Sequence, residues 1–174
     1  MRRHVVLVGL PGSGKTTVGR LAAAKLGAPF VDLDAEIERV AGQTIPEIFE
    51  TRGESGFRAL ERSAMRNAMR AEPAVLAPGG GWAAQPGAME EVREPAFIIY
   101  LAVPVAVAAE RVALESRRSM VDRRPLTVDH PLAVLMEERE AFYRQADVVV
   151  SNAADEPTSV AKLVSELARR YAGW

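Results

Sequence analysis

The clearest chemical pattern lies in the stretch VGLPGSGKTT, which runs from Val8 to Thr17. Gly9 and Gly14 are separated by four residues and followed by Lys15 and Thr16, the spacing of a loop that holds phosphate with its backbone N–H groups. The positive end of a following helix favours phosphate oxygens, and the lysine can reach the β- and γ-phosphates. The stretch therefore predicts binding of a nucleoside triphosphate. A switch protein or an ATP-driven motor could use the same loop, so phosphate transfer does not follow from it alone.

A pair of aspartates follows the next apolar run. Asp32 and Asp34 end the stretch PFVDLD, which we predict as a strand over Pro29–Asp34. Side chains of an extended chain alternate, so Asp32 could approach a metal while Asp34 turns toward a second substrate. The alternative is structural, with one aspartate as the N-cap of a helix and the other as a charge in its first turn.

A basic and an acidic residue share one predicted helical face in GESGFRALE, residues 53–61. Arg58 and Glu61 are three residues apart, which in isolation favours a surface ion pair. A fixed guanidinium is also the side chain best suited to grip a carboxylate with two hydrogen bonds. The spacing of Arg58 and Glu61 fits both a surface ion pair and an arginine that binds a carboxylate.

Two further segments are candidates for ligand contact. LAPGGGW places Gly79, Gly80 and Gly81 after a predicted strand, where bare backbone would let a ligand approach closely. A flexible turn is the alternative. The arginine-rich stretch from Arg117 to Arg124 could be a lid that closes over ATP and excludes water, or a solvated basic loop.

Strands and helices alternate along the whole chain. This order predicts an α/β fold with a mainly parallel sheet and helices on both faces. The expected strands are residues 5–8, 29–34, 74–77, 96–101 and 147–151. The expected helices lie near residues 18–26, 37–41, 45–49, 57–69, 104–115, 132–143 and 157–171.

Length and composition fit one enzyme-sized domain. The chain has 174 residues and a net charge of -1, so nothing predicts a general attraction to nucleic acid or to an anionic membrane. It has no cysteine, which excludes disulfides and thiolate metal sites. No apolar run reaches membrane-spanning length, and the apolar run that follows residues 1–4 is too short for a signal peptide with a cleavage site. These features are consistent with a cytoplasmic protein.

Taken together, the motifs resemble those of the shikimate kinases. The stretch GESGFRALE matches the family's most diagnostic segment, G-E-x-x-F-R-x-x-E, which is far more specific than a phosphate loop. The other matching segments, in family order, are GLPGSGKTTVGRLAA, FVDLDAEIE, the three glycines, RRPL at Arg123–Leu126 and REAFYRQAD at Arg139–Asp147. The resemblance covers almost the whole chain. It implies a P-loop fold like that of nucleoside monophosphate kinases, with a five-stranded parallel sheet of order 2-3-1-4-5.

The resemblance implies transfer of the γ-phosphate of ATP to the 3-hydroxyl of shikimate. The implied nucleotide contacts are Gly12, Ser13, Gly14, Lys15, Thr16, Thr17, Arg117 and Pro157. The implied acceptor contacts are Asp34, Arg58, Gly79, Gly80, Gly81 and Arg139. Lys15, Asp34 and Arg124 would act in catalysis, Glu61 would orient Arg58, and Mg²⁺ would bind Thr16 directly and Asp32 through water.

The implied organisation is a single domain, 1–174, with a substrate-binding segment at about 34–61 and a lid at about 115–127. The protein would be a monomer, and the small molecules ATP and shikimate would be its only partners. The chain departs from the family at Pro78, where threonine is usual, and at the bulky Trp82. Pro78 has no N–H to donate, and Trp82 could narrow the pocket or pack beneath it. Two other functions remain open: a kinase of another polyol acid such as gluconate, and a nucleotide-dependent binding protein.

Overall fold

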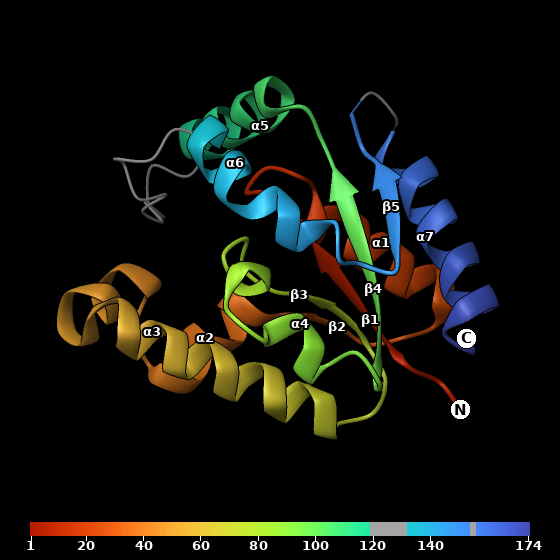
Figure 1. Cartoon of the computed structure of the whole chain (residues 1–174), viewed down its shortest axis with the longest axis horizontal. Coiled ribbons are helices and arrows are strands. Elements are labelled where there is room, and N and C mark those ends of the chain that lie inside the picture. Colours follow the sequence, from red (N-terminus) through yellow and green to blue (C-terminus); the bar gives the residue numbers. More distant parts are fainter. Residues whose placement is uncertain (119–131, 154–155) are drawn as a thin grey trace.

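The centre of the molecule is a five-stranded sheet in which every neighbouring pair is parallel (Figure 1). The structure is a computed structural model that describes residues 1–118, 132–153 and 156–174, with side chains of all of these except 115–118. The strands are β1 (His4–Val8), β2 (Phe30–Asp32), β3 (Val75–Ala77), β4 (Ala96–Ala102) and β5 (Val148–Ser151). Their order is β2-β3-β1-β4-β5, which confirms the order expected from the family resemblance.

Helices cover both faces of this sheet, as predicted. Helices α1 (Lys15–Leu26) and α7 (Pro157–Tyr171) pack on one face. The other elements are α2 (Leu33–Ala41), α3 (Ile45–Arg70), the 3₁₀ turn η1 (Trp82–Ala84), α4 (Ala88–Glu91), α5 (Val105–Arg118) and α6 (Leu132–Tyr143). The sequence did not predict η1 or α4. The two helices that it predicted at 45–49 and 57–69 are the two parts of α3, which are joined at a non-helical Gly53.

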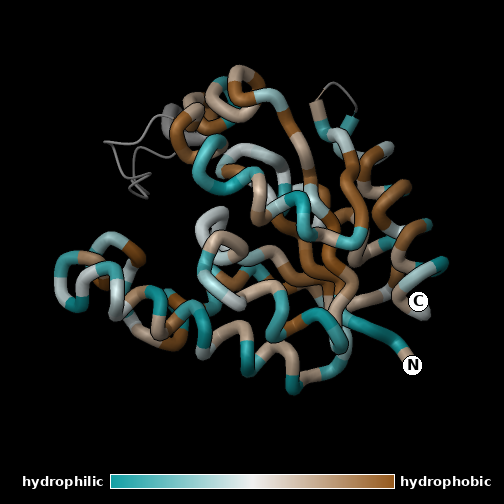
Figure 2. The backbone as a smooth tube through the Cα atoms, in the orientation of Figure 1, coloured by the Kyte–Doolittle hydropathy of each residue, from teal (hydrophilic) through white to brown (hydrophobic). Residues whose placement is uncertain are grey.

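Alternating side chains divide the core into two layers. In β1, Val5 and Leu7 pack toward α1 and α7, whereas Val6 and Val8 pack toward α3, η1 and α6. A strand buried on both faces needs an uninterrupted apolar sequence, and VVLV supplies it. Figure 2 shows the hydrophobic residues concentrated along the central strands, with hydrophilic residues spread over the outer helices.

Strand β2 is shorter than the sequence predicted. It ends at Asp32, and Leu33 already begins α2, so Asp34 lies in the first helical turn. Asp32 caps this helix, because its Oδ1 accepts hydrogen bonds from the N–H groups of Asp34 at 3.1 Å and Ala35 at 3.3 Å. The strand alternation expected for the two aspartates is therefore wrong. The helix N-cap, which the sequence left as an alternative, is present.

Helix α3 contains a kink at Gly53. The residue has φ 65° and ψ -176°, a backbone conformation open almost only to glycine. The helix begins with a capping box, in which Thr44 and Glu47 each satisfy a backbone N–H of the other. The kink explains why helical periodicity fails between residues 49 and 57, and it separates the N-terminal arm of α3 from the part that carries Arg58.

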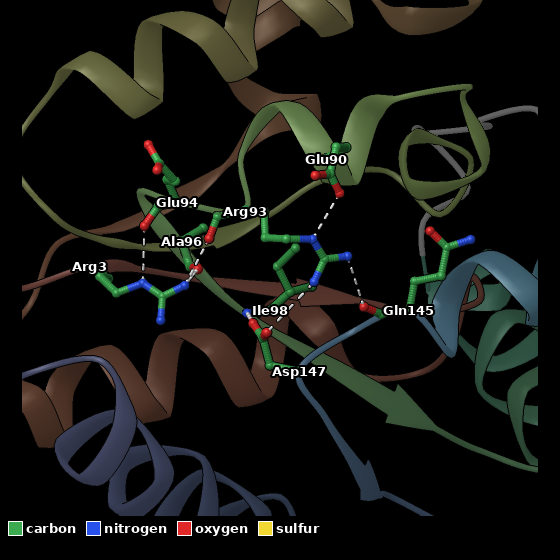
Figure 3. Close-up of polar contacts among 8 residues, drawn as sticks. All are labelled: Arg3, Glu90, Arg93, Glu94, Ala96, Ile98, Gln145 and Asp147. Atoms are coloured by element: carbon green, nitrogen blue, oxygen red, sulfur yellow. Dashed lines mark hydrogen bonds and ion pairs between the residues drawn. The ribbon is translucent and has the colours of Figure 1, made fainter.

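Polar contacts fix the edge of the sheet where β4 begins (Figure 3). The Arg3 guanidinium donates to the carbonyl oxygens of Arg93, Glu94 and Ala96. Asp147 accepts from the Ile98 N–H at 2.7 Å, and its other oxygen lies 3.9 Å from Arg93. These contacts lie at the amino ends of the strands, whereas the residues predicted to do chemistry lie at the carboxyl ends.

Candidate active site at the carboxyl edge of the sheet

The phosphate loop joins β1 to α1, as the sequence predicted. Gly12 has φ 77° and Gly14 has φ 90°, so both occupy the left-handed region that favours glycine. A Cβ on Gly12 would lie 2.4 Å from the Ala108 carbonyl oxygen, and one on Gly14 would lie 2.5 Å from Asn152 Nδ2. These glycines are therefore required by backbone conformation and by close packing.

Lys15 folds back over the loop. Its Nζ donates to the carbonyl oxygens of Gly9 and Leu10, both at 2.9 Å. A charged amine held by loop carbonyls lies at the start of α1, where the helix dipole also favours an anion. An entering phosphate would therefore meet the amine and the N–H groups of the first helical turn together.

Two oxygen ligands meet beside the loop. Thr16 Oγ1 donates to Asp32 Oδ2 at 3.0 Å, although the two residues belong to different elements. A hydroxyl and a carboxylate are hard oxygen donors, so this donor set fits Mg²⁺. Among the described residues, no group of three or more His, Cys, Asp or Glu side chains could hold a metal. The remaining ligands of such an ion would have to come from phosphate and water.

Arg58 and Glu61 form a buried pair instead of a surface one. Arg58 Nη1 donates to Glu61 Oε2 at 2.8 Å, and the two side chains are 15% and 1% exposed. Burial raises the pKa of the Glu61 carboxyl and the nearby Asp34 carboxylate adds to this effect, while the Arg58 and Arg139 guanidiniums oppose it. The same interactions place Asp34, Arg58 and Arg139, which come from three different helices, near Glu61.

The three glycines approach this cluster closely. A Cβ on Gly79 would lie 2.9 Å from Asp34 Oδ1, and one on Gly81 would lie 2.8 Å from Arg58 Nη2. A Cβ on Gly80 would lie 2.9 Å from Pro11 Cδ, in the phosphate loop. Side chains at these positions would displace the charged groups and the phosphate loop. The glycines therefore keep the two halves of the site, the charged cluster and the phosphate loop, in contact.

Tyr143, at the end of α6, links the two halves, and we did not single it out from the sequence. Its hydroxyl donates to the Gly80 carbonyl oxygen at 2.5 Å and also interacts with the Arg139 guanidinium. Burial raises the pKa of this phenol to about 12, with smaller opposing contributions from Arg139, so it stays protonated at neutral pH. The tyrosine at the end of REAFY could have been flagged, because a buried phenol needs a hydrogen-bond partner.

Two more residues missed in the sequence brace the phosphate loop. Asn152 Nδ2 donates to the Ser13 carbonyl at 2.8 Å. Arg111, from α5, donates to the carbonyls of Asn152 at 2.8 Å and Gly12 at 3.4 Å. These contacts join residues up to 139 positions apart, so no local pattern could predict them.

The remaining predicted residues differ in how far the structure describes them. Thr17 is exposed in the first turn of α1, and Pro157 is exposed as the first residue of α7. Trp82 is 1% exposed and packs in the core, so it lies beneath the glycine segment. Arg124 and most of the predicted lid, 115–127, lie outside the described residues, as does the side chain of Arg117.

Comparisons with known proteins identify the family of the chain. A sequence profile described as shikimate kinase matches residues 11–169. The chain is 40% identical over 172 residues to a shikimate kinase of Thermobifida fusca, covering 95% of this chain and 94% of that protein. The chain belongs to the shikimate kinase family. Members of this family are ATP-dependent kinases, so the chain is an enzyme of that class, and the binding-protein alternative is not supported.

A solved shikimate kinase resembles this chain more closely than a solved gluconokinase that shares its fold. Shikimate kinase from Acinetobacter baumannii in complex with shikimate superimposes with a TM-score of 0.86 at 33% identity, covering 98% of this chain and 94% of that one. A gluconokinase from Sinorhizobium meliloti 1021 reaches a TM-score of 0.63 at 18% identity, covering 99% and 94%. The second likeness extends to the fold alone. The shikimate kinase assignment is therefore favoured over the gluconate alternative.

Proposed function

We propose that the chain transfers the γ-phosphate of ATP to the 3-hydroxyl of shikimate, giving shikimate 3-phosphate for aromatic amino acid biosynthesis. The observation that carries this proposal is the cluster around Glu61. Asp34, Arg58 and Arg139 converge there beside the glycines that contact the phosphate loop. Two guanidiniums next to an aspartate suit an acceptor that has one carboxylate and several hydroxyls.

On the acceptor side, we assign Arg58 and Arg139 to the shikimate carboxylate. Arg58 Nε and Glu61 Oε1 are buried and have no hydrogen-bond partner among the described residues. Buried polar atoms without partners are costly, so a polar ligand that satisfied the guanidinium would bind favourably. Glu61 orients Arg58 through their 2.8 Å contact, and the backbone of Gly79, Gly80 and Gly81 would contact the acceptor.

Asp34 is assigned to the hydroxyl that receives the phosphate. It either accepts the proton of that hydroxyl or aims the oxygen at the γ-phosphate. Because the transition state of phosphoryl transfer is loose, the demand for a strong base is small, and orientation alone can supply much of the rate.

On the nucleotide side, the phosphates would bind the backbone and side chains of the loop. We assign this contact to Gly12, Ser13, Gly14, Lys15, Thr16 and Thr17. Lys15 would exchange its two loop carbonyls for phosphate oxygens and offset the charge that spreads over them during transfer. Arg117 and Pro157 would border the adenine, and Arg124 would approach the transferring phosphate from the lid at about 115–127.

The hydroxyl of Thr16 and the carboxylate of Asp32 would hold Mg²⁺, Thr16 directly and Asp32 through water. When bound with ATP, the ion would neutralise charge on the β- and γ-phosphate oxygens. The 3.0 Å contact between Thr16 and Asp32 supports this assignment, because it brings two hard oxygen donors together beside the phosphate loop.

We further propose that the enzyme is a single-domain cytoplasmic monomer that uses neither nucleic acid nor a membrane. Its net charge of -1 supports the absence of a general attraction to either polyanion. None of the helices described by the structure is long and apolar enough to cross a bilayer. Light scattering on the purified protein would test the oligomeric state.

The function is tested by following ADP release from ATP and Mg²⁺ with shikimate, with gluconate or with no acceptor. We expect ADP release to depend on shikimate and to stay at the background rate with gluconate. Lys15→Ala should lower the shikimate-dependent rate at least about a hundredfold, whereas Lys25→Ala, an exposed lysine on the same helix, should leave it unchanged. A gluconate-dependent rate, or ADP release independent of any acceptor, would contradict the proposal.

A further inference from the structure

Tyr143 occupies the point where the two halves of the site meet. It is fully buried at the end of α6, and its ring stacks on Tyr100 of β4 with 5.2 Å between centroids. Its hydroxyl contacts one group on each side. It donates to the Gly80 carbonyl oxygen at 2.5 Å and interacts with the Arg139 guanidinium.

The Gly80 contact continues into the phosphate loop. The space next to the Gly80 Cα is filled by Pro11 and by the Gly9 carbonyl oxygen, which a Cβ would meet at 2.9 and 3.2 Å. That same Gly9 carbonyl accepts a hydrogen bond from Lys15 Nζ at 2.9 Å. Tyr143 is thus the middle of a continuous series of contacts from Arg139 to Lys15.

We propose that Tyr143 is a positioning residue for phosphoryl transfer, whose hydroxyl holds Arg139 and the Gly80 backbone in register with the phosphate loop. The Arg139 side chain has several rotatable bonds, and the Tyr143 hydroxyl removes part of its conformational freedom before the acceptor binds. Phosphoryl transfer depends strongly on alignment of the two reactants, so a small rotation of Arg139 would be felt in the rate. The inference rests on the proposed assignment of Arg139 to the acceptor carboxylate.

The alternative is that Tyr143 only fills the core. Tyr100 is a matched control for a role in packing alone. It is also buried, its ring stacks on the ring of Tyr143, and both residues belong to the same apolar layer. Its hydroxyl contacts only the sulfur of Met136, at 3.8 Å, among the hydrogen bonds of the described residues. Tyr100→Phe and Tyr143→Phe therefore remove equivalent atoms, but only the second removes the contact to Arg139 and Gly80.

The test is a steady-state comparison of Tyr143→Phe and Tyr100→Phe in the full chain, varying shikimate and ATP in turn. We expect Tyr143→Phe to lower kcat/KM for shikimate about tenfold, the effect of one hydrogen bond to a charged group, with the KM for ATP changed less than about twofold. Tyr100→Phe should change all of these constants less than about twofold. Equal constants for the two variants would overturn the proposal.

A double-mutant cycle tests whether Tyr143 acts through Arg139. If it does, Arg139→Gln combined with Tyr143→Phe loses less activity than the product of the two single losses. Losses that multiply fully would overturn the proposal. Should Tyr143→Phe fail to fold, Tyr143→4-aminophenylalanine keeps the ring and a donor for Gly80 but accepts poorly from Arg139. It should still lower kcat/KM for shikimate, and unchanged kinetics would overturn the link.

The assignment of Arg139 can fail separately from the inference. Arg139→Gln with an unchanged KM for shikimate would contradict the proposed clamp and with it the role of Tyr143. A raised KM in Arg139→Gln together with matching constants for Tyr143→Phe and Tyr100→Phe would leave the clamp in place and overturn only the role of Tyr143.

Discussion

Arg58 lies between two carboxylates that differ greatly in exposure. Glu61 is 1% exposed and lies 2.8 Å from it, whereas Glu54 is 73% exposed and lies 3.6 Å away. The buried contact fixes one edge of the guanidinium, and the exposed one is screened by water. The arginine is therefore held in place by Glu61 while the rest of its donors remain available to a ligand.

Replacing Arg58 tests its proposed contact with the acceptor. Arg58→Ala removes a charged, two-point contact, so we expect the KM for shikimate to rise between about tenfold and a hundredfold with the KM for ATP nearly unchanged. Steady-state kinetics with each substrate varied would measure this, with Arg62→Ala, an exposed arginine one turn along α3, as the control. Equal losses of affinity for both substrates would count against a carboxylate clamp.

The buried Glu61 carboxyl predicts a pH dependence of stability. Burial raises its pKa above the ordinary value of 4.5, so the folded protein binds this proton more tightly than the unfolded chain. The stabilising contribution is full below that value and is lost as the pH rises through the folded pKa. We expect the free energy of unfolding of the parent protein, relative to Glu61→Gln, to decrease from about pH 4.5 upward. Urea titrations at several pH values would measure it, and a difference that grew with pH would refute the assignment.

Helix α3 is the element that carries Arg58 and Glu61 into the acceptor cluster. Its kink at Gly53 turns the N-terminal arm away from the segment that carries Arg58 and Glu61 (Figure 1). Nothing lies within 4 Å of the place where a Gly53 Cβ would be, so space does not require glycine there. Only the backbone conformation does, which makes this glycine a constraint on helix direction.

Gly53→Ala therefore isolates the role of the kink. Because alanine strains this conformation, we expect the free energy of unfolding to fall by about 1–3 kcal/mol and the KM for shikimate to rise. Thermal unfolding and steady-state kinetics would check both effects. Thr44→Ala, which weakens only the N-cap of α3, is expected to cost about 1 kcal/mol of stability without changing the KM for shikimate. Parent-like stability in Gly53→Ala would show that the helix does not need the kink.

The elements differ in how well the sequence predicted them. The phosphate loop and the apolar strands were found because their patterns are local. The end of β2 was placed two residues late, because Asp32 and Asp34 fit either an extended chain or a helix start. The burial of the Arg58–Glu61 pair could not be derived from their spacing, which is common on exposed helices. It depends on a segment distant in sequence, because Gly79 and Gly81 approach the Glu61 and Arg58 side chains closely.

At the scale of the whole molecule, the amino ends and the carboxyl ends of the strands have different roles. Arg3, Arg93 and Asp147 join the chain near the amino ends of the strands, far in sequence from one another. The opposite edge gathers the phosphate loop, the acceptor cluster and the glycine segment. Ligands of open α/β sheets bind at this carboxyl edge, where loops and helix starts supply polar groups. The contacts at the amino ends of the strands therefore hold the sheet together, while the residues at the carboxyl ends bring two anionic substrates into contact.

The central claim is that the enzyme transfers the γ-phosphate of ATP to the 3-hydroxyl of shikimate, and it is tested most directly by identifying the product. Phosphorus–proton correlation NMR of the reaction of the purified chain with ATP, Mg²⁺ and shikimate would show which hydroxyl carries the new phosphate. We predict a single phosphate ester, coupled to the proton at the third ring carbon and formed in the same amount as ADP. Release of inorganic phosphate without an ester, or an ester on another hydroxyl, would contradict the account.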